Sequence, residues 1–198
     1  MCGIFSIIGK SDLQDNIVNE YFLKIKHRGP DMSSLHIINN KVTLGFHRLA
    51  IIDPNPISNQ PLKLDELFLI CNGEIFNYLE LIEQFKFRNQ LKTHSDCEVI
   101  LHLYKHYGGG IQAINYICNI IQAEFAFILY DRLNKKIYTA RDTFGVRPLF
   151  YGIYNSGGEN TENTYCFASE LKAINFCQYV EPYMPGKIME INLTNLEI

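Results

Sequence analysis

Met1-Cys2-Gly3-Ile4-Phe5-Ser6-Ile7-Ile8-Gly9 opens the chain, and the fold can be worked out from this stretch. Residues 4–8 are apolar and β-branched and Gly9 ends them, which predicts a buried strand starting almost at the first residue. If Met1 is removed, Cys2 carries a thiol and a free α-amine. That amine titrates near ~8, so it is partly neutral at pH 7 and can accept the thiol proton. The plainer interpretation is that Cys2 is the second residue of an ordinary protein.

The rest of the chain alternates between blocks of strands and blocks of helices. Apolar spacing predicts helices over residues 15–26 and 111–120, and a third from a capping box at Ser95-Asp96-Cys97-Glu98 to about His106. Hairpins are expected for residues 35–38 with 41–46, 125–130 with 136–140, and 149–154 with 164–168. Further strands are expected at 67–71, ended by Asn72-Gly73, and at 188–193. This order favours antiparallel sheets with helices on their faces, in one domain over residues 1–198.

Composition excludes several classes of protein. The 198 residues are 47% hydrophobic and 20% charged with a net charge of -3, so the chain can bury a core and has no basic excess for nucleic acid or an anionic membrane. There is no signal-peptide pattern at the amino end, and no apolar run approaches the roughly 20 residues of a membrane span. The 6 cysteines are scattered without a C-x-x-C pair, which indicates reduced thiols and a cytoplasmic protein.

Four residues could complete a reaction centre around Cys2. The Asn72 amide and the Gly73 backbone N–H could both donate to one oxyanion, although Asn-Gly is also a common turn. The forked guanidinium of Arg48 suits an α-carboxylate. Asp96 is expected in the first turn of a capped helix, where the helix dipole favours its charged form, and it suits an α-ammonium. Each of the last two residues alone could equally be an ordinary surface charge.

Taken together, the motifs resemble those of the class II glutamine amidotransferases, which are N-terminal-nucleophile hydrolases. Among them the chain is most similar to the glutaminase domain of glutamine-hydrolysing asparagine synthetase. The matching segments lie in order along the chain: Met1-Cys2-Gly3-Ile4, Lys26-His27-Arg28-Gly29-Pro30-Asp31, His47-Arg48-Leu49-Ala50-Ile51-Ile52-Asp53, Asn72-Gly73-Glu74-Ile75-Phe76-Asn77, Ser95-Asp96-Cys97-Glu98-Val99-Ile100, Ala140-Arg141-Asp142-Thr143-Phe144-Gly145-Val146-Arg147-Pro148-Leu149-Phe150-Tyr151 and Phe167-Ala168-Ser169-Glu170-Leu171-Lys172.

The resemblance implies a four-layer αββα sandwich and a role for each matching residue. It implies that Cys2 attacks the side-chain amide of L-glutamine and forms a γ-glutamyl thioester, while Asn72 and Gly73 hold the oxyanion. Water then releases glutamate, and the ammonia passes to a synthetase site. The segments around Arg28 and Arg141-Asp142 are expected to shape the pocket and the domain interface rather than to do chemistry. The substrate-binding residues it implies are Arg48, Leu49, Ala50, Ile51, Ile52, Asn72, Gly73, Glu74 and Asp96.

Several features set limits on this resemblance. Ser156-Gly157-Gly158-Glu159-Asn160 begins like a pyrophosphate loop but lacks its Asp-Ser, so it is interpreted as a flexible turn, and ATP and Mg are expected only in a synthetase domain outside these residues. Ala123 stands where the family usually has Gly and could crowd a tight turn. His102 and His106 have the spacing of metal ligands, but no third ligand follows, so a pair on the helix surface is expected and no metal site.

Alternative functions remain open at this point. The chain could be the glutaminase of another class II amidotransferase, or a catalytically silent glutamine-binding domain, for instance one that keeps Met1. It could be a piece of a longer synthetase or a separate chain serving one, and a homodimer is possible.

Overall fold

Two antiparallel sheets form the centre of the molecule. The computed structural model describes residues 1–156 and 163–198. The first sheet has the strand order β10-β8-β9-β1-β3-β2 and the second β11-β7-β6-β5-β4. The strands are β1 (Gly3–Ile8), β2 (Met32–Asn39), β3 (Val42–Arg48), β4 (Leu62–Leu64), β5 (Leu67–Ile75), β6 (Ala123–Asp131), β7 (Lys136–Arg141), β8 (Phe150–Tyr154), β9 (Thr164–Ala168), β10 (Tyr179–Pro182) and β11 (Ile188–Asn192).

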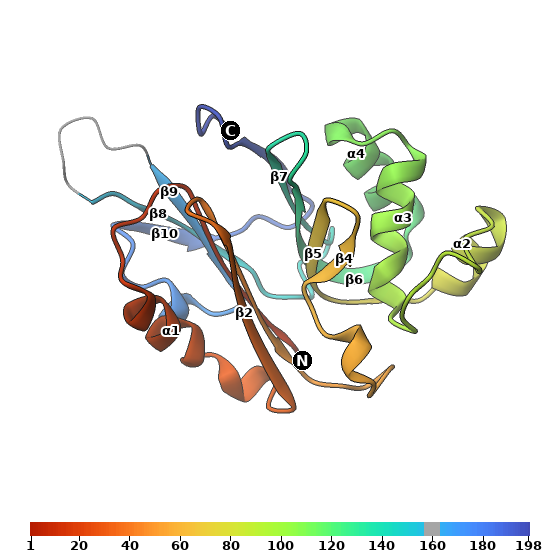
Figure 1. The fold of residues 1–198 in the computed structure, drawn as a ribbon, viewed down its shortest axis with the longest axis horizontal. Helices are drawn as coiled ribbons and strands as arrows, with labels where there is room; N and C mark the ends of the chain where they lie inside the picture. Colours follow the sequence, from red (N-terminus) through yellow and green to blue (C-terminus); the bar gives the residue numbers. More distant parts are fainter. Residues whose placement is uncertain (157–162) are drawn as a thin grey trace.

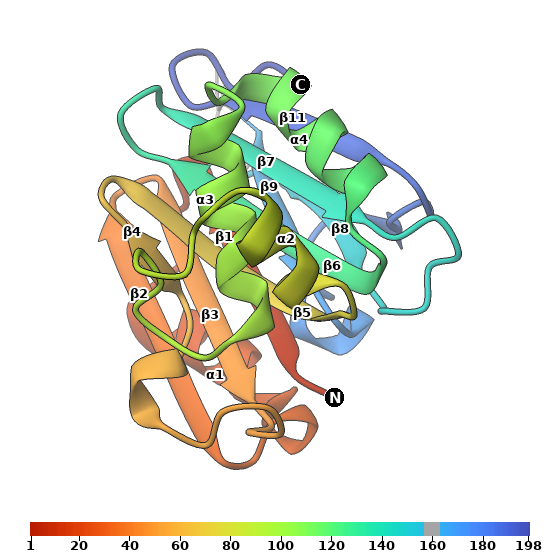
Figure 2. The same ribbon diagram turned by 90° about the vertical axis from the view of Figure 1, so that its right-hand side faces the viewer.

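Helices cover the two outer faces of the sheets, which completes four layers. α1 (Asp15–Leu23) lies outside the first sheet, and α2 (Tyr78–Gln84), α3 (Val99–His106) and α4 (Gly110–Ile120) lie outside the second (Figures 1 and 2). Three buried apolar clusters fill the three gaps between the layers. The predicted αββα sandwich is therefore confirmed, and its sheets combine short hairpins with pairings between distant segments such as β1 and β9.

β1 is a central strand that is buried on both faces. Ile4 and Ile8 point into the cluster between the sheets, whereas Phe5 and Ile7 point into the cluster under α1. This alternation follows from the two-residue period of a strand, and it explains why β1 reads as a continuous apolar run. Cys2 directly precedes β1 and packs against the cluster between the sheets. The predicted opening strand is thus confirmed, and it places Cys2 beside the cluster between the sheets while Met1 stays exposed.

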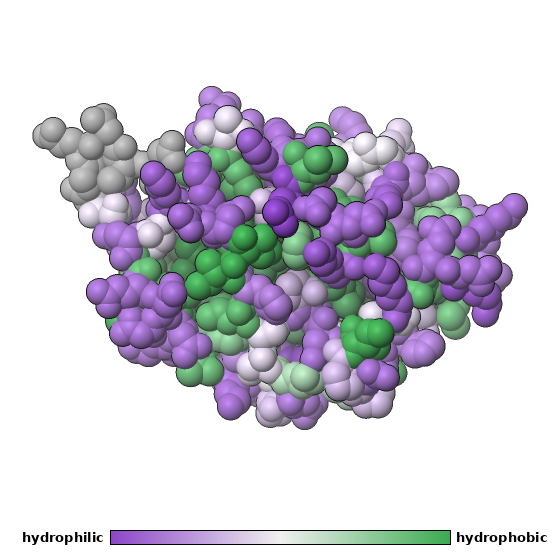
Figure 3. All heavy atoms as spheres, in the orientation of Figure 1, coloured by the Kyte–Doolittle hydropathy of each residue, from purple (hydrophilic) through white to green (hydrophobic). Residues whose placement is uncertain are grey.

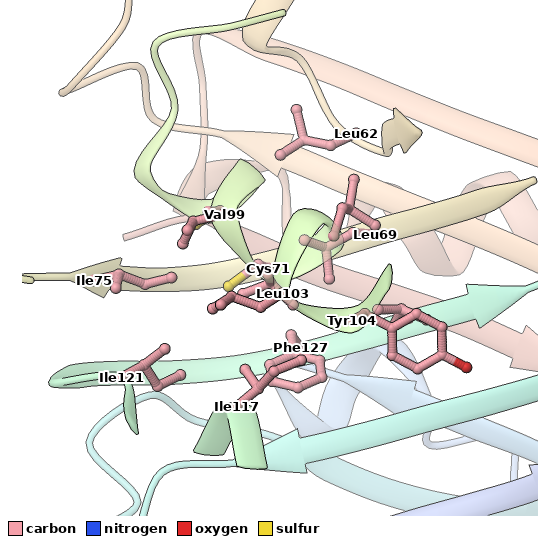
Figure 4. Packing of buried hydrophobic residues seen from close by; sticks show 14 of the residues in the cluster. Leu62, Leu69, Cys71, Ile75, Val99, Leu103, Tyr104, Ile117, Ile121 and Phe127 are labelled. Atoms are coloured by element: carbon pink, nitrogen blue, oxygen red, sulfur yellow. The ribbon is translucent and has the colours of Figure 1, made fainter. Parts of the chain in front are cut away.

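The second sheet packs against α3 and α4 through the largest cluster. Figure 4 shows Leu69 and Cys71 of β5 and Phe127 of β6 lying against Leu103 of α3 and Ile117 of α4. Apolar residues recur at helical spacing on both helices, so one stripe of each is buried. The face drawn in Figure 3 is mainly hydrophilic, with hydrophobic atoms gathered near its centre. Within the described ranges, none of the helices is long and apolar enough to cross a membrane.

Most predicted elements are confirmed, including the three hairpins and the strand near the carboxyl end. Two boundaries were wrong. α1 ends at Leu23, and Lys26–Arg28 forms a separate 3-10 turn. β5 does not stop at Asn72-Gly73 but continues to Ile75, because both residues pair with β6.

The predicted capping box was also wrong. The Ser95 side chain makes no capping bond, and a 3-10 turn at Asp96–Glu98 precedes α3. The Glu98 carboxylate instead accepts hydrogen bonds from the backbone N–H groups of Lys92 and Thr93, both at 2.8 Å. It therefore orders the loop before the turn rather than the helix itself.

Three elements were not predicted from the sequence, and two other predicted features differ from the structure or lie largely outside the described residues. α2, β4 and β10 were not predicted, because they are short and lack a clear apolar period. Ala123 lies in β6 opposite Ile75, not in a tight turn. The Gly157 to Asn160 part of the predicted flexible turn lies outside the described residues.

Candidate active site

A cavity of about 650 Å³, including its open mouth, lies where the two sheets meet. Cys2 and the end of β3 line it from the first sheet, and Asn72 and Gly73 of β5 line it from the second. Asp96 and Cys97 close a further side, and Met1 lies at the wall. The structure therefore brings together Cys2, Asn72, Gly73, Arg48 and Asp96, which are up to 94 positions apart in the sequence.

Cys2 is held from several directions. The Leu49 N–H donates to its Sγ atom at 3.3 Å, and the Arg28 Nε donates to its carbonyl oxygen at 2.9 Å. Burial raises the pKa of the Cys2 thiol, while the Leu49 N–H and the positive amine of Met1 act in the opposite direction. The thiol is therefore mainly protonated near neutral pH and needs a base before it can act as a nucleophile.

The Arg28-Gly29-Pro30-Asp31 motif fixes the position of Cys2. A Cβ on Gly29 would lie 2.2 Å from the carbonyl of His47, so only glycine permits this close approach to β3. The Asp31 carboxylate accepts a hydrogen bond from the Ala50 N–H at 2.8 Å. The segment around Arg28 thus holds Cys2 and the end of β3 in place, but none of residues 28–31 lines the cavity itself.

Asn72 and Gly73 lie side by side on β5, at the wall of the cavity. Asn72 is only 2% exposed, and its buried Nδ2 atom has no hydrogen-bond partner in the part of the chain that the structure describes. A Cβ on Gly73 would lie 2.8 Å from the carbonyl oxygen of Glu124, so the position has no room for a side chain. A buried amide donor without a partner is rare and costly in a folded protein, which makes it the signature of a group kept for a ligand.

Arg48 and Asp96 line the same cavity, but their surroundings differ from the expectation. The Arg48 Nη1 donates to the Asn55 carbonyl and to Asn59 Oδ1, both at 3.0 Å, and Nη2 donates to the Asp53 carbonyl. Its guanidinium thus supports the loop that follows β3. Whether it also binds a carboxylate stays a prediction.

Asp96 is buried and accepts a hydrogen bond from the Ile75 N–H at 2.7 Å. Burial raises its pKa, and the Ile75 N–H only partly opposes this. The expectation that a helix dipole favours its charge was wrong about the dominant effect, because the short 3-10 turn supplies little field and burial prevails.

The remaining predicted binding residues are distributed unevenly around the cavity. Leu49, Ile51, Ile52 and Glu74 line it, and Ile51 is largely exposed. Ala50 does not line it, and only its N–H has a defined partner, Asp31.

Arg147 also lines the cavity, and the residue-by-residue interpretation of the sequence missed it. Asp142 accepts hydrogen bonds from the backbone N–H groups of Val146 (3.0 Å) and Arg147 (3.2 Å), and Arg141 donates to the Arg147 carbonyl at 2.7 Å. These contacts confirm that Arg141 and Asp142 shape the pocket. The signal that could have found Arg147 was its place in a segment already matched for Arg141-Asp142.

Two other predicted features lie away from this cavity. His102 is buried beside Glu98, so the expectation of a surface histidine pair was wrong for His102. Its ring packs on Phe87, which explains why α3 buries it. Across residues 1–156 and 163–198, no group of three or more His, Cys, Asp or Glu side chains is placed to hold a metal ion.

The family of the chain follows from comparison with known proteins. A family model described as a glutamine amidotransferase domain matches residues 1–195. The chain belongs to this family. Its likeness to asparagine synthetases is close. A probable asparagine synthetase (glutamine-hydrolysing) of Acanthamoeba polyphaga mimivirus and the asparagine synthetase (glutamine-hydrolysing) of Rattus norvegicus are both 37% identical, over 201 and 205 residues. Each alignment covers 98% of this glutamine amidotransferase domain and 34% of the relative, so the chain spans about a third of their length.

Solved structures agree on the fold of the amidotransferase domain. An allosteric regulatory enzyme of purine biosynthesis matches with a TM-score of 0.76 at 23% identity, over 96% of this chain and 47% of the other. A glutamine phosphoribosylpyrophosphate amidotransferase from B. subtilis matches with a TM-score of 0.75 at 24% identity, over 99% and 48%. At these identities the likeness concerns the fold alone.

Proposed function

We propose that this domain hydrolyses the side-chain amide of L-glutamine to glutamate and ammonia, with Cys2 as the nucleophile once Met1 is removed. One observation carries the proposal: the buried Nδ2 donor of Asn72 has no partner among the described residues, and Asn72 lines the same cavity as Cys2. A thiol and a free amide donor across one cavity are what acyl transfer from an amide requires.

The reaction proceeds in two steps. The free α-amine of Cys2 takes the thiol proton as Sγ attacks the amide carbon, and the oxyanion accepts hydrogen bonds from Asn72 Nδ2 and the Gly73 N–H. The amine then returns the proton to the leaving nitrogen, so the C–N bond breaks, ammonia leaves and a γ-glutamyl thioester remains. Water adds to the thioester by the same route, and glutamate leaves as the thiol is restored.

In this proposal, the end of glutamine that carries the α-amine and α-carboxylate binds at the side of the cavity away from the Cys2 thiol. Asp96 and Glu74 face the α-ammonium, Arg48 the α-carboxylate, and Leu49, Ile51 and Ile52 the aliphatic stem. Asp96 and Glu74 both line the cavity, so two carboxylates can share the α-ammonium.

The ammonia would serve asparagine synthesis in a synthetase domain that binds ATP and Mg, either in the same gene product or in a separate chain. The support is the 37% identity to glutamine-hydrolysing asparagine synthetases. The scattered, unpaired cysteines support a cytoplasmic location. The gene sequence beyond Ile198 tests the acceptor: a Ser-Gly-Gly-x-Asp-Ser motif there favours asparagine synthesis, and a phosphoribosyl-transfer domain contradicts it.

A matched pair of proteins tests the nucleophile. One has Cys2 exposed as the first residue by a specific protease, and the other keeps an uncleaved extension before Cys2. Intact-mass measurement verifies each amino end, and ammonia release from L-glutamine is then assayed. We expect activity only in the first protein, and none after Cys2→Ala. Equal activity in Cys2→Ala and wild type would exclude this mechanism.

A further inference from the structure

Two carboxylates face each other beside the cavity. Glu74 of β5 and Glu124 of β6 are direct cross-strand partners. Like charges in such positions destabilise a sheet. The Arg147 Nη2 atom lies 3.7 Å from Glu74 Oε2 and 3.4 Å from Glu124 Oε2, so one guanidinium serves both carboxylates.

Arg147 is fixed before any ligand binds. Its backbone N–H and carbonyl are held by Asp142 and Arg141, and its side chain is 14% exposed, against 51% for Glu74 and 38% for Glu124. Its Nε atom is buried without a partner. The guanidinium is thus the rigid member of the group, and Glu74 is the member that lines the cavity.

We propose that Arg147 is a positioning residue that holds the Glu74 carboxylate at the cavity wall as a receptor, beside Asp96, for the α-ammonium of glutamine. The inference rests on the proposed function. Arg147 offsets the charge of Glu124, which would otherwise repel Glu74 from the wall. Asp96 alone is a poor receptor for a cation, because its burial opposes its ionisation. Glu74 is half-exposed, so it pays little desolvation to stay ionised and supplies the missing charge.

The test uses Arg147→Met and two ligands that differ only at the α-amine. L-glutamine is the substrate, and glutaramate, which lacks the α-amine, is the competitive inhibitor. We expect the KM for glutamine to rise about 3- to 10-fold, the range of a partly exposed ion pair. The kcat should stay within about twofold, and the inhibition constant of glutaramate should not change, because it has no ammonium to bind. Arg147→Lys should restore most of the loss, because it keeps the charge.

The matched control is Arg132→Met. Arg132 pairs with Glu66 at 3.4 Å, is half-exposed, and does not line the cavity. We expect its KM for glutamine to equal that of wild type. If Arg147→Met does not fold, Glu74→Gln replaces it, with the same expected difference between glutamine and glutaramate.

Each other outcome overturns the inference. If Arg147→Met weakens the binding of glutamine and glutaramate equally, Arg147 acts at the carboxylate end or has a general structural role. If the KM for glutamine is unchanged in this variant, Arg147 has no role in glutamine binding. Both results leave the proposed function intact when wild type hydrolyses glutamine. If wild type, with Cys2 at its amino end, neither hydrolyses nor binds L-glutamine in a calorimeter, the proposed function fails and the inference falls with it.

Discussion

The Leu49 backbone N–H lies 3.3 Å from the Sγ atom of Cys2, across the ends of two adjacent strands. This contact lowers the pKa of the thiol, but burial outweighs it, and the net shift is upward. The thiolate fraction therefore rises with pH throughout the neutral range. We expect the rate of Cys2 alkylation by iodoacetamide to increase nearly tenfold per pH unit between about pH 6 and 8. The Cys2→Ala variant gives the background from the other thiols. A rate that is flat over this range would mean that the thiol is already ionised.

Asn72→Ala should reduce catalysis without reducing stability. The Nδ2 atom has no protein partner, so its removal breaks no hydrogen bond in the folded state. We expect kcat to fall about 10²- to 10³-fold, the effect of one oxyanion donor. The midpoint of thermal unfolding should stay within a few degrees of wild type, measured by calorimetry. A large fall in that midpoint with kcat unchanged would show that Asn72 is a structural residue.

Asp96→Asn should weaken glutamine binding but should not destabilise the fold at pH 7. Burial raises the pKa of Asp96 in the folded state, so ionisation at neutral pH costs folding free energy. That cost is absent below the ordinary pKa of an Asp in the unfolded chain, grows as pH rises above it, and is complete above the folded-state pKa. Asn can still accept the Ile75 hydrogen bond. We expect the KM to rise about 10- to 100-fold with the loss of a charged contact.

Asp65→Asn is the matched control for the direction of this effect on stability. Asp65 is exposed, and Lys105 lowers its pKa, so its ionised form favours folding. We expect a slightly lower unfolding midpoint at pH 7 and no change in the KM for glutamine. A lower midpoint for Asp96→Asn than for Asp65→Asn would contradict the effect assigned to burial.

Gly29→Ala should destabilise the protein severely. The added methyl would lie 2.2 Å from the His47 carbonyl, and its nearest neighbours are all backbone atoms of His47 and Arg48, which cannot rotate away. We expect a loss of about 3 kcal/mol or more in the free energy of unfolding, measured with urea. Gly3→Ala is the control, because its methyl would lie 3.4 Å from the nearest atom. Equal stability of the two variants would show that β3 can move away.

The layered fold could be predicted because its elements are local. Hairpins such as β6–β7 join neighbouring segments, and the apolar run of β1 indicates that this strand is buried. The boundary at Asn72-Gly73 was wrong because the dipeptide is typical of turns, while pairing with Ala126 and Phe125 of the distant strand β6 keeps it extended. Such pairing is a tertiary effect that a local pattern does not contain.

The site was predictable in its residue types and less so in its electrostatics. Cys2, Asn72 and Gly73 were found by position and motif, and they meet at one cavity. The raised pKa of Asp96 depends on burial, and the bonds of Arg48 to the loop depend on how that loop folds back. Neither property can be read from the spacing of charges in the chain.

Cys2 sits at the head of β1 in one sheet, and Asn72 lies on β5 in the other, with the middle apolar cluster between the sheets. The thickness of that layer therefore helps to set the distance between the Cys2 and Asn72 side chains. Ile70 and Ile128 are fully buried in this layer and separate the two sheets. In the proposed reaction, a change of one methylene there would alter the attack geometry without touching the site, so the interior of this sandwich would contribute to catalysis as well as to stability.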